Sequence, residues 1–200
     1  MRIRQGGRVP PEGRKPVKSR SIHRITVRRS VLEPSHGQLA AGAMRFPCAL
    51  GRGGLSRSKR EGDGATPVSA LALRRLWLRG DHGQRPPTGL PVRLIQADDG
   101  WCDAASHPRY NKPVRLPFRA SHERMRRDDA LYDLVIELGW NDRPVRRGRG
   151  SAIFMHVAKP GFSPTEGCVA LNAKSLRRLA GRLGLETIVS IGLGPRKLRG

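Results

Sequence analysis

Short apolar runs separated by turn residues limit how this chain of 200 residues can fold. Its 24 glycines and 16 prolines favour turns and short strands over long helices. Residues 131–138 are the clearest predicted strand, and residues 151–157 are a second, nearly continuous apolar run, as in a strand buried on both faces. Helical spacing of leucines occurs over residues 172–183, between a capping Asn172 and a terminating Gly184. The pattern predicts a mainly β fold, a curled sheet or sandwich with one packed helix near the C-terminus.

Other strands are expected wherever short apolar segments meet turn signals. The segment 68–78 suits either a strand or a short helix, and residues 81–112 are a turn-rich excursion that carries Trp101. The remaining expected strand segments are residues 22–27, 38–50 (as a hairpin partner) and 186–191.

Positive charge is concentrated at the ends of the chain, whose formal net charge is +23. Residues 1–29 contain ten Lys or Arg residues against one acid, Glu12, and the tail from Leu193 adds three more. Between the ends, the basic residues are scattered, and the few aromatic residues do not interleave with them as base-stacking platforms would. We therefore expect no specific nucleic-acid binding, but electrostatic association with an anionic polymer or membrane surface is expected.

The chain divides into three predicted parts. Residues 1–20 are rich in Arg, Pro and Gly without periodic apolar residues, so we expect a disordered basic segment. Residues 21–192 suit one compact domain, and residues 193–200 form a basic tail. No window approaches the ~20 apolar residues of a membrane-spanning helix.

The three cysteines, Cys48, Cys102 and Cys168, are an odd number without Cys-x-x-Cys spacing. This argues against a zinc ribbon and against a fully paired disulfide framework. One disulfide with one free thiol remains open, but we expect Cys48 and Cys102 to be buried structural residues. The scattered histidines give no metal-ligand spacing, so no metal or cofactor is expected.

His156 and Cys168 form the candidate catalytic pair. His156 lies at the end of the apolar run, and Cys168 follows twelve residues later, after a Gly- and Pro-containing loop and just before the predicted helix. A thiol nucleophile needs a base within hydrogen-bond distance or one water away, and this placement allows it. Since a free cysteine has a pKa of ~8.5, a neighbouring imidazolium and the positive end of the helix would favour the thiolate. A structural histidine and a core cysteine are the alternative, but the intervening loop is poor core material.

Gly167 precedes the candidate nucleophile and allows close backbone approach. The N–H groups of Gly167 and Cys168 are therefore candidate donors to a developing oxyanion.

Two separated motifs resemble one known family. Residues 150–156 (GSAIFMH) followed by residues 165–171 (TEGCVAL) look like the catalytic motif of YkuD-type L,D-transpeptidases. Residues 59–67 (KREGDGATP) look like that family's Lys-x-Gly-Asp-x-x-Thr-Pro loop, with one extra residue between Lys59 and Gly62. The resemblance spans roughly residues 22–191, and the order of the two motifs makes it specific.

The resemblance implies an L,D-transpeptidase-like, mainly β domain that acts on peptidoglycan stem peptides. Cys168 would attack the carbonyl of the third stem residue, expel the terminal D-alanine and form a thioester, with His156 as the base. A side-chain amine of a second stem would then take the acyl group, making a cell-wall cross-link. Gly167 takes the position of the oxyanion loop, with Glu166 and Thr165 beside it.

Two positions depart from the commoner family motif. Glu166 stands where a second His is usual, and Ala170 stands where Arg is frequent. Glu166 is expected either to orient a partner, such as a substrate amine, or to shape the loop. Both departures affect the acceptor and the substrate more than the reaction class.

The resemblance also implies a place in the cell envelope or periplasm. We expect a monomer, and its positive charge suits electrostatic association with the anionic surface of the envelope. No apolar run of 7–15 residues follows the basic N-terminus, so no secretory signal is visible. Another export route and a true start downstream of Met1 are both open, and the second is favoured.

Further residues have weaker functional assignments. Tyr132 and residues 140–142 (Trp-Asn-Asp) bracket the strand before the His156 strand, and they either line the cleft or serve packing and turn roles. His122 is a candidate substrate contact or an exposed loop residue. Three functions stay open: the transpeptidase, an L,D-carboxypeptidase-type hydrolase with water as acceptor, and a basic binding protein on an inactive scaffold.

Overall fold

A computed structural model describes residues 21–192 of the chain. The expectations for residues 1–20 and 193–200 fall outside the described residues. Nine strands form the main sheet: β1 (Arg24–Arg29), β2 (His36–Ala41), β3 (Met44–Ala49), β6 (Ser69–Leu78), β7 (Val92–Leu94), β11 (Leu134–Leu138), β12 (Phe154–Val157), β13 (Val169–Leu171) and β14 (Ile188–Ile191).

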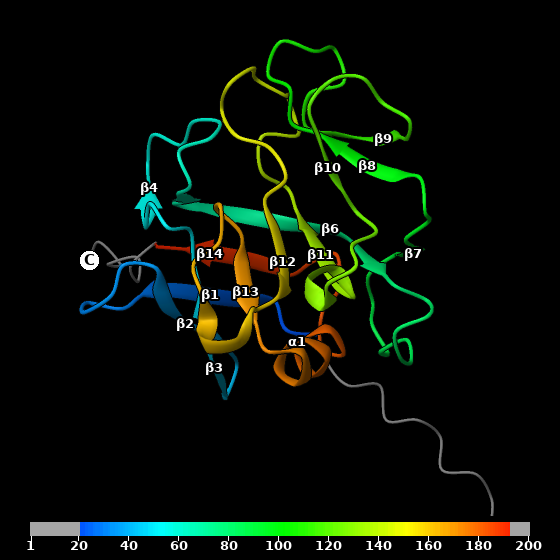
Figure 1. Cartoon of the computed structure of the whole chain (residues 1–200). Coiled ribbons are helices and arrows are strands. Elements are labelled where there is room, and N and C mark those ends of the chain that lie inside the picture. Colours follow the sequence, from blue (N-terminus) through cyan, green and yellow to red (C-terminus); the bar gives the residue numbers. More distant parts are fainter. Residues whose placement is uncertain (1–20, 193–200) are drawn as a thin grey trace, which may run out of the picture.

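The main sheet is mixed and curls on itself (Figure 1). Its order is β11-β12-β13-β3-β2-β1-β14-β6-β7, and β11 also pairs with β6. The long strand β6 makes this closure possible, because residues 69–72 pair with β14 and residues 73–78 pair with β11. Pairs β1–β14, β12–β13 and β6–β7 are parallel, and the other pairs are antiparallel. The sheet thus adopts a barrel-like arrangement.

Two smaller sheets and two short 3-10 helices complete the strand-and-turn framework. The strands β8 (Asp99–Cys102), β9 (Lys112–Arg115) and β10 (His122–Arg124) form a second sheet in the order β10-β8-β9. The strands β4 (Leu55–Ser56) and β5 (Thr66–Pro67) pair in parallel. The 3-10 helices are η1 (Ala130–Tyr132) and η2 (Pro160–Phe162).

The one α-helix within residues 21–192 is α1 (Ala173–Ala180). The side chain of Asn172 accepts a hydrogen bond from the N–H of Ser175, which confirms the predicted N-cap. The helix ends at Gly181 rather than at the predicted Gly184. Its buried face, with Leu176 and Leu179, covers one end of the main sheet (Figure 1).

Two apolar clusters form the core. The larger one fills the curled main sheet and includes the alternating side chains of β1, Ile25 and Val27. The smaller one lies around Trp77, Trp101 and Phe154, where ring centroids are 6.3 Å and 5.0 Å apart in edge-to-face contacts. Cys168 belongs to this second cluster, so its packing positions the candidate nucleophile.

The prediction of a mainly β, curled mixed sheet with one packed helix near the C-terminus is confirmed for the described residues. Three local predictions differ from the structure in detail. Residues 38–50 form two strands of a meander, because Gly42 adopts a positive φ of 59° at the turn. The excursion 81–112 contains β7, β8 and the start of β9, with Trp101 inside β8. Only residues 134–138 of the predicted strand 131–138 are extended, after the 3-10 turn η1.

Candidate active site

Cys168 lies directly before β13 and is 8% exposed. Its thiol donates a hydrogen bond to the carbonyl of Ala152 at 3.2 Å, and its sulfur accepts one from the N–H of Phe154 at 3.3 Å. Ala152 itself has a positive φ of 51° in the segment leading into β12. These two backbone contacts hold the sulfur against the start of β12.

His156 lies within β12 and is 7% exposed. Its Nδ1 lies 2.8 Å from the carbonyl oxygen of Val157, which can only accept, so Nδ1 carries the proton. Burial lowers the pKa of His156 to about 4, so the imidazole is neutral at pH 7. Nε2 is therefore unprotonated, which is the form that a general base requires.

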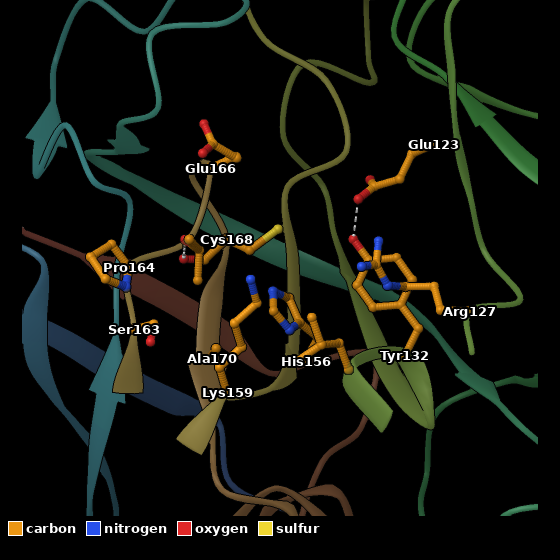
Figure 2. Close-up of a pocket in the computed structure, with 12 residues that line it drawn as sticks. Glu123, Arg127, Tyr132, His156, Lys159, Ser163, Pro164, Glu166, Cys168 and Ala170 are labelled. Carbon is orange, nitrogen blue, oxygen red and sulfur yellow. Dashed lines mark hydrogen bonds between the residues drawn. The ribbon is translucent and has the colours of Figure 1, made fainter. Parts of the chain in front are cut away.

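Strand pairing places the two predicted catalytic residues on one face of the sheet. In the parallel pair β12–β13, His156 lies opposite Ala170. Residues two apart in an extended chain share a face, so Cys168 and Ala170 both lie on the His156 side. Figure 2 shows the sulfur and the imidazole directed into the same space, and both residues line one cavity of about 180 Å³.

The sulfur makes no direct hydrogen bond to the imidazole in this structure. Within residues 21–192, Sγ of Cys168 bonds to backbone groups of Ala152 and Phe154 instead. The structure thus brings the two residues to one cavity but leaves their catalytic pairing as a prediction.

The resting thiol is protonated, against our expectation. Burial first, and then the negative charge of Glu123, raise the pKa of Cys168 to about 12, outweighing the N–H of Phe154 and the charge of Lys59. The expected imidazolium is absent because His156 is buried and neutral. The prediction that the positive end of the helix favours the thiolate is also wrong. The strand β13 separates Cys168 from α1, and a helix dipole acts only within about one turn of the helix end.

The loop before Cys168 is fixed by one hydroxyl group. Oγ1 of Thr165 accepts from the N–H of Gly167 at 3.1 Å and donates to the carbonyl of Cys168 at 2.7 Å. Gly167 has a φ of +134°, and a Cβ there would lie 2.8 Å from the carbonyl oxygen of Ala65. Only glycine fits at this position. Because its N–H already bonds to Thr165, the oxyanion role of Gly167 stays a prediction that requires this donor to turn or to be shared.

The second predicted motif, residues 59–67, packs behind this loop. Lys59 is 3% exposed and forms a salt bridge with Asp63 at 2.5 Å. Burial alone would raise the pKa of Asp63, but hydrogen bonds from Lys59 and from backbone N–H groups hold it below its ordinary value. Thr66 donates to the carbonyl of Cys168 at 3.5 Å, and Ala65 contacts Gly167. Two motifs that lie about a hundred residues apart in sequence thus meet at the candidate nucleophile.

Glu166 forms an exposed salt bridge with Arg52. The guanidinium Nε lies 3.0 Å and 2.8 Å from the two carboxylate oxygens, and the side chains are 57% and 77% exposed for Arg52 and Glu166. This contact joins the Cys168 loop to the turn after β3. Glu166 also lines the cavity, so both of its predicted roles remain compatible with the geometry.

Sequence reasoning missed three charged residues of this cavity: Glu123, Arg127 and Lys159. They come from separate segments without a recognisable motif, although Glu123 adjoins His122, which was singled out. Glu123 accepts a hydrogen bond from the hydroxyl of Tyr132 at 2.6 Å, and burial raises the pKa of Glu123.

Tyr132 lines the cavity of about 180 Å³, which was one of the two roles predicted for it. Its ring packs edge-to-face on the imidazole of His156, with centroids 5.3 Å apart, and the guanidinium of Arg127 lies 5.2 Å from its centroid. Burial raises the pKa of Tyr132 well above its ordinary value, so the hydroxyl stays protonated and donates to Glu123. Tyr132 thus fixes one wall of the cavity beside the imidazole (Figure 2).

A second cavity of about 510 Å³ also opens onto Cys168. Its lining contains four acidic residues together with Arg124, Arg127 and His122. The position of His122 in this lining fits its predicted role as a substrate contact. The acidic residues are Glu61, Asp103, Glu123 and Glu166.

The other residues singled out from the sequence lie elsewhere. Residues 140–142 do not line either cavity at Cys168 and serve the packing and turn alternative: Asp142, for example, forms a salt bridge with Arg74 at 2.6 Å. Cys48 and Cys102 are buried free thiols. Residues 21–192 contain no group of three or more His, Cys, Asp or Glu that could hold a metal ion. No helix among them is long and apolar enough to span a membrane.

The comparison with protein-family models agrees with the motif resemblance. The family model described as the L,D-transpeptidase catalytic domain (YkuD) matches residues 30–191. Among solved structures, L,D-transpeptidase 1 of Mycobacterium tuberculosis is similar, with 8% sequence identity and a TM-score of 0.36. That match covers 84% of this chain and 60% of the other, so the chain spans about 60% of the length of that protein. No curated protein matches the chain. Because the family model covers most of its length, the chain belongs to the family of YkuD L,D-transpeptidase catalytic domains.

Proposed function

We propose that this protein is an L,D-transpeptidase that acts on peptidoglycan stem peptides through a thioester on Cys168. The observation that carries the proposal is the shared cavity. The thiol faces it from the residue directly before β13, and a neutral imidazole with an unprotonated Nε2 faces it from the adjacent parallel strand β12. Nucleophilic catalysis by cysteine requires this combination of groups. Membership of the family supports the reaction class.

The protonated resting thiol determines the order of events. Nε2 of His156 takes the S–H proton as the sulfur leaves the Ala152 carbonyl and attacks the carbonyl carbon of the third stem residue. The imidazolium then gives this proton to the departing amine of D-alanine, and a thioester remains. A stem-peptide amine that has lost its extra proton to solvent attacks the thioester. His156 takes one N–H proton from the attacking amine and gives it to the departing thiolate, which regenerates the thiol. Bringing a carbonyl carbon to the sulfur replaces the Ala152 contact that holds the thiol at rest.

The larger cavity favours an amine over water as the acceptor. A transpeptidase must hold two substrates at one sulfur, and Cys168 opens onto two cavities. The cavity of about 510 Å³ is lined by four acidic residues against two arginines, Arg124 and Arg127, and this acidic excess attracts a protonated amine. The L,D-carboxypeptidase-type hydrolase remains the second candidate. Its acceptor is water, which needs no second binding cavity. A basic binding protein on an inactive scaffold is disfavoured, since the thiol, the imidazole and the close-packed Gly167 are all present.

We place the protein in the cell envelope, where the proposed substrate lies, as a monomer attracted electrostatically to anionic surfaces. The family supports this location, and the net charge of +23 supports the attraction. Peptidoglycan stem peptides are its proposed partners.

Steady-state kinetics with a stem tetrapeptide and an amine acceptor test the proposal. D-Alanine release and cross-linked product are measured for wild type, Cys168→Ser, His156→Ala and the double variant. Each single variant should lose at least a hundredfold in kcat, and the double variant should be little worse, because the two residues act as a unit. Multiplying losses would contradict the pairing. D-Alanine release without cross-linked product, at any acceptor concentration, would favour the hydrolase.

A further inference from the structure

A cationic cavity lies apart from both cavities at Cys168. Its volume is about 280 Å³, slightly below the roughly 300–1,000 Å³ of most small-molecule pockets. None of its lining residues lines a cavity at the candidate nucleophile, and none is acidic. Four exposed arginines surround a base that includes Lys59 and Trp140: Arg57, Arg143, Arg146 and Arg149.

The positive charge of this cavity is not neutralised by neighbouring residues. Within residues 21–192, none of the four guanidinium groups forms an ion pair or a hydrogen bond, whereas Lys59 is paired with Asp63. The nearby carboxylate of Asp142 is bound to Arg74. The cavity therefore presents about four unpaired positive charges.

The loop that carries three of these arginines is held in place from within. Asn141, with a positive φ of 49°, donates to the carbonyls of Arg146 and Gly150 at 2.9 Å and accepts from the N–H of Arg146 at 2.8 Å. Nε1 of Trp140 donates to the carbonyl of Arg149 at 2.9 Å. Since the backbone is already ordered, a ligand loses little affinity to loop ordering.

Charge and side-chain type together select a class of ligand. Guanidinium groups bind phosphate oxygens in bidentate fashion. A single carboxylate would neutralise one of about four charges, whereas a phosphomonoester carries about −1.5 to −2 at pH 7 and a diphosphate carries more. We propose that this cavity binds a phosphate-bearing ligand of the diphosphate type, separately from the acyl-transfer site.

Isothermal titration calorimetry of the full chain with pyrophosphate, at constant ionic strength, tests this site. The pocket variant is Arg143→Ala/Arg146→Ala. Its control is Arg28→Ala/Arg29→Ala, which removes the same charge from an exposed part of β1 outside the cavity. The pocket variant should bind at least tenfold more weakly than wild type, and the control should bind within about twofold. Arg143→Lys/Arg146→Lys, which keeps the charge but loses bidentate geometry, should also weaken binding several-fold.

A second arm separates the two sources of such a phosphate. Vesicles of phosphatidylcholine with phosphatidic acid present a lipid phosphate, and sedimentation measures their binding. A selective loss for the pocket variant in both arms identifies a lipid headgroup as a source, and a selective loss with pyrophosphate alone identifies a soluble ligand. Equal losses for pocket and control variants with pyrophosphate, or unchanged binding in the pocket variant, would overturn the proposal. The proposal would also be overturned if acetate displaced pyrophosphate from the cavity as well as inorganic phosphate does.

Discussion

Lowering the pH should destabilise the folded protein through His156. The ordinary pKa of 6.5 falls to about 4 in the folded state because the imidazole is buried. Between these values the unfolded chain binds a proton that the folded protein does not bind. The stabilising contribution is therefore complete above pH 6.5 and is lost as the pH falls toward 4. Lowering the pH from 7 to 4.5 crosses roughly two pH units between the two pKa values. Each unit costs ~1.4 kcal/mol, so the free energy of unfolding should fall by about 2–3 kcal/mol.

Urea denaturation of wild type and His156→Asn at pH 7 and 4.5 isolates this contribution. In the variant, the side-chain N–H₂ can still donate to the carbonyl of Val157, but no group titrates in this range. The free energy of unfolding should therefore fall by about 2–3 kcal/mol less in His156→Asn than in wild type. Cys168→Ser is the matched control, since it keeps the buried imidazole and should retain the wild-type pH dependence. Equal pH dependence in wild type and His156→Asn would refute a buried, neutral imidazole.

Three further predictions concern the loop around the sulfur. With a pKa near 12, the Cys168 thiol should be alkylated by iodoacetamide at pH 8 roughly a thousandfold more slowly than in the urea-unfolded chain, as followed by peptide mass spectrometry; equal rates would show an activated thiolate. Thr165→Ala should lower the free energy of unfolding by about 1–3 kcal/mol, because the N–H of Gly167 loses its partner and the carbonyl of Cys168 keeps only the longer bond from Thr66, while Thr165→Ser should lose less. Glu166→Gln should change stability by less than about 1 kcal/mol and turnover by a modest factor, since its partner Arg52 is exposed; a loss in turnover as deep as that of His156→Ala would place the carboxylate in the base role.

Local sequence patterns predicted most of the main sheet and the helix. The helix over residues 172–183 was recognised from leucine spacing and the Asn172 cap, and β12 from its apolar run. The second sheet could not be predicted in this way. Its strands are three or four residues long and lie among turn residues, and β8 is positioned by contacts of Trp101 with Trp77 and Phe154, which no local pattern shows.

Sequence spacing predicted that Cys168 and His156 would meet at one site, and the structure places both on one cavity. The ionisation of the pair could not be predicted, because it depends on burial. The same holds for Glu123, Arg127 and Lys159, which reach the cavity from three separate segments and have no common motif. Motifs thus pointed to the candidate reacting groups, whereas the residues that surround them could be identified only from the fold.

Intact mass spectrometry after incubation with a stem tetrapeptide, and in parallel with a carbapenem, tests the central claim most directly. Attack by the thiol on the tetrapeptide should add the mass of the peptide minus D-alanine, and opening of the β-lactam ring should add the full mass of the carbapenem. Peptide mapping should place both adducts on Cys168, and Cys168→Ser should carry neither. His156→Ala should form them at least a hundredfold more slowly. Wild type without either adduct, or an adduct on Cys48 or Cys102 instead, would contradict acyl transfer through Cys168.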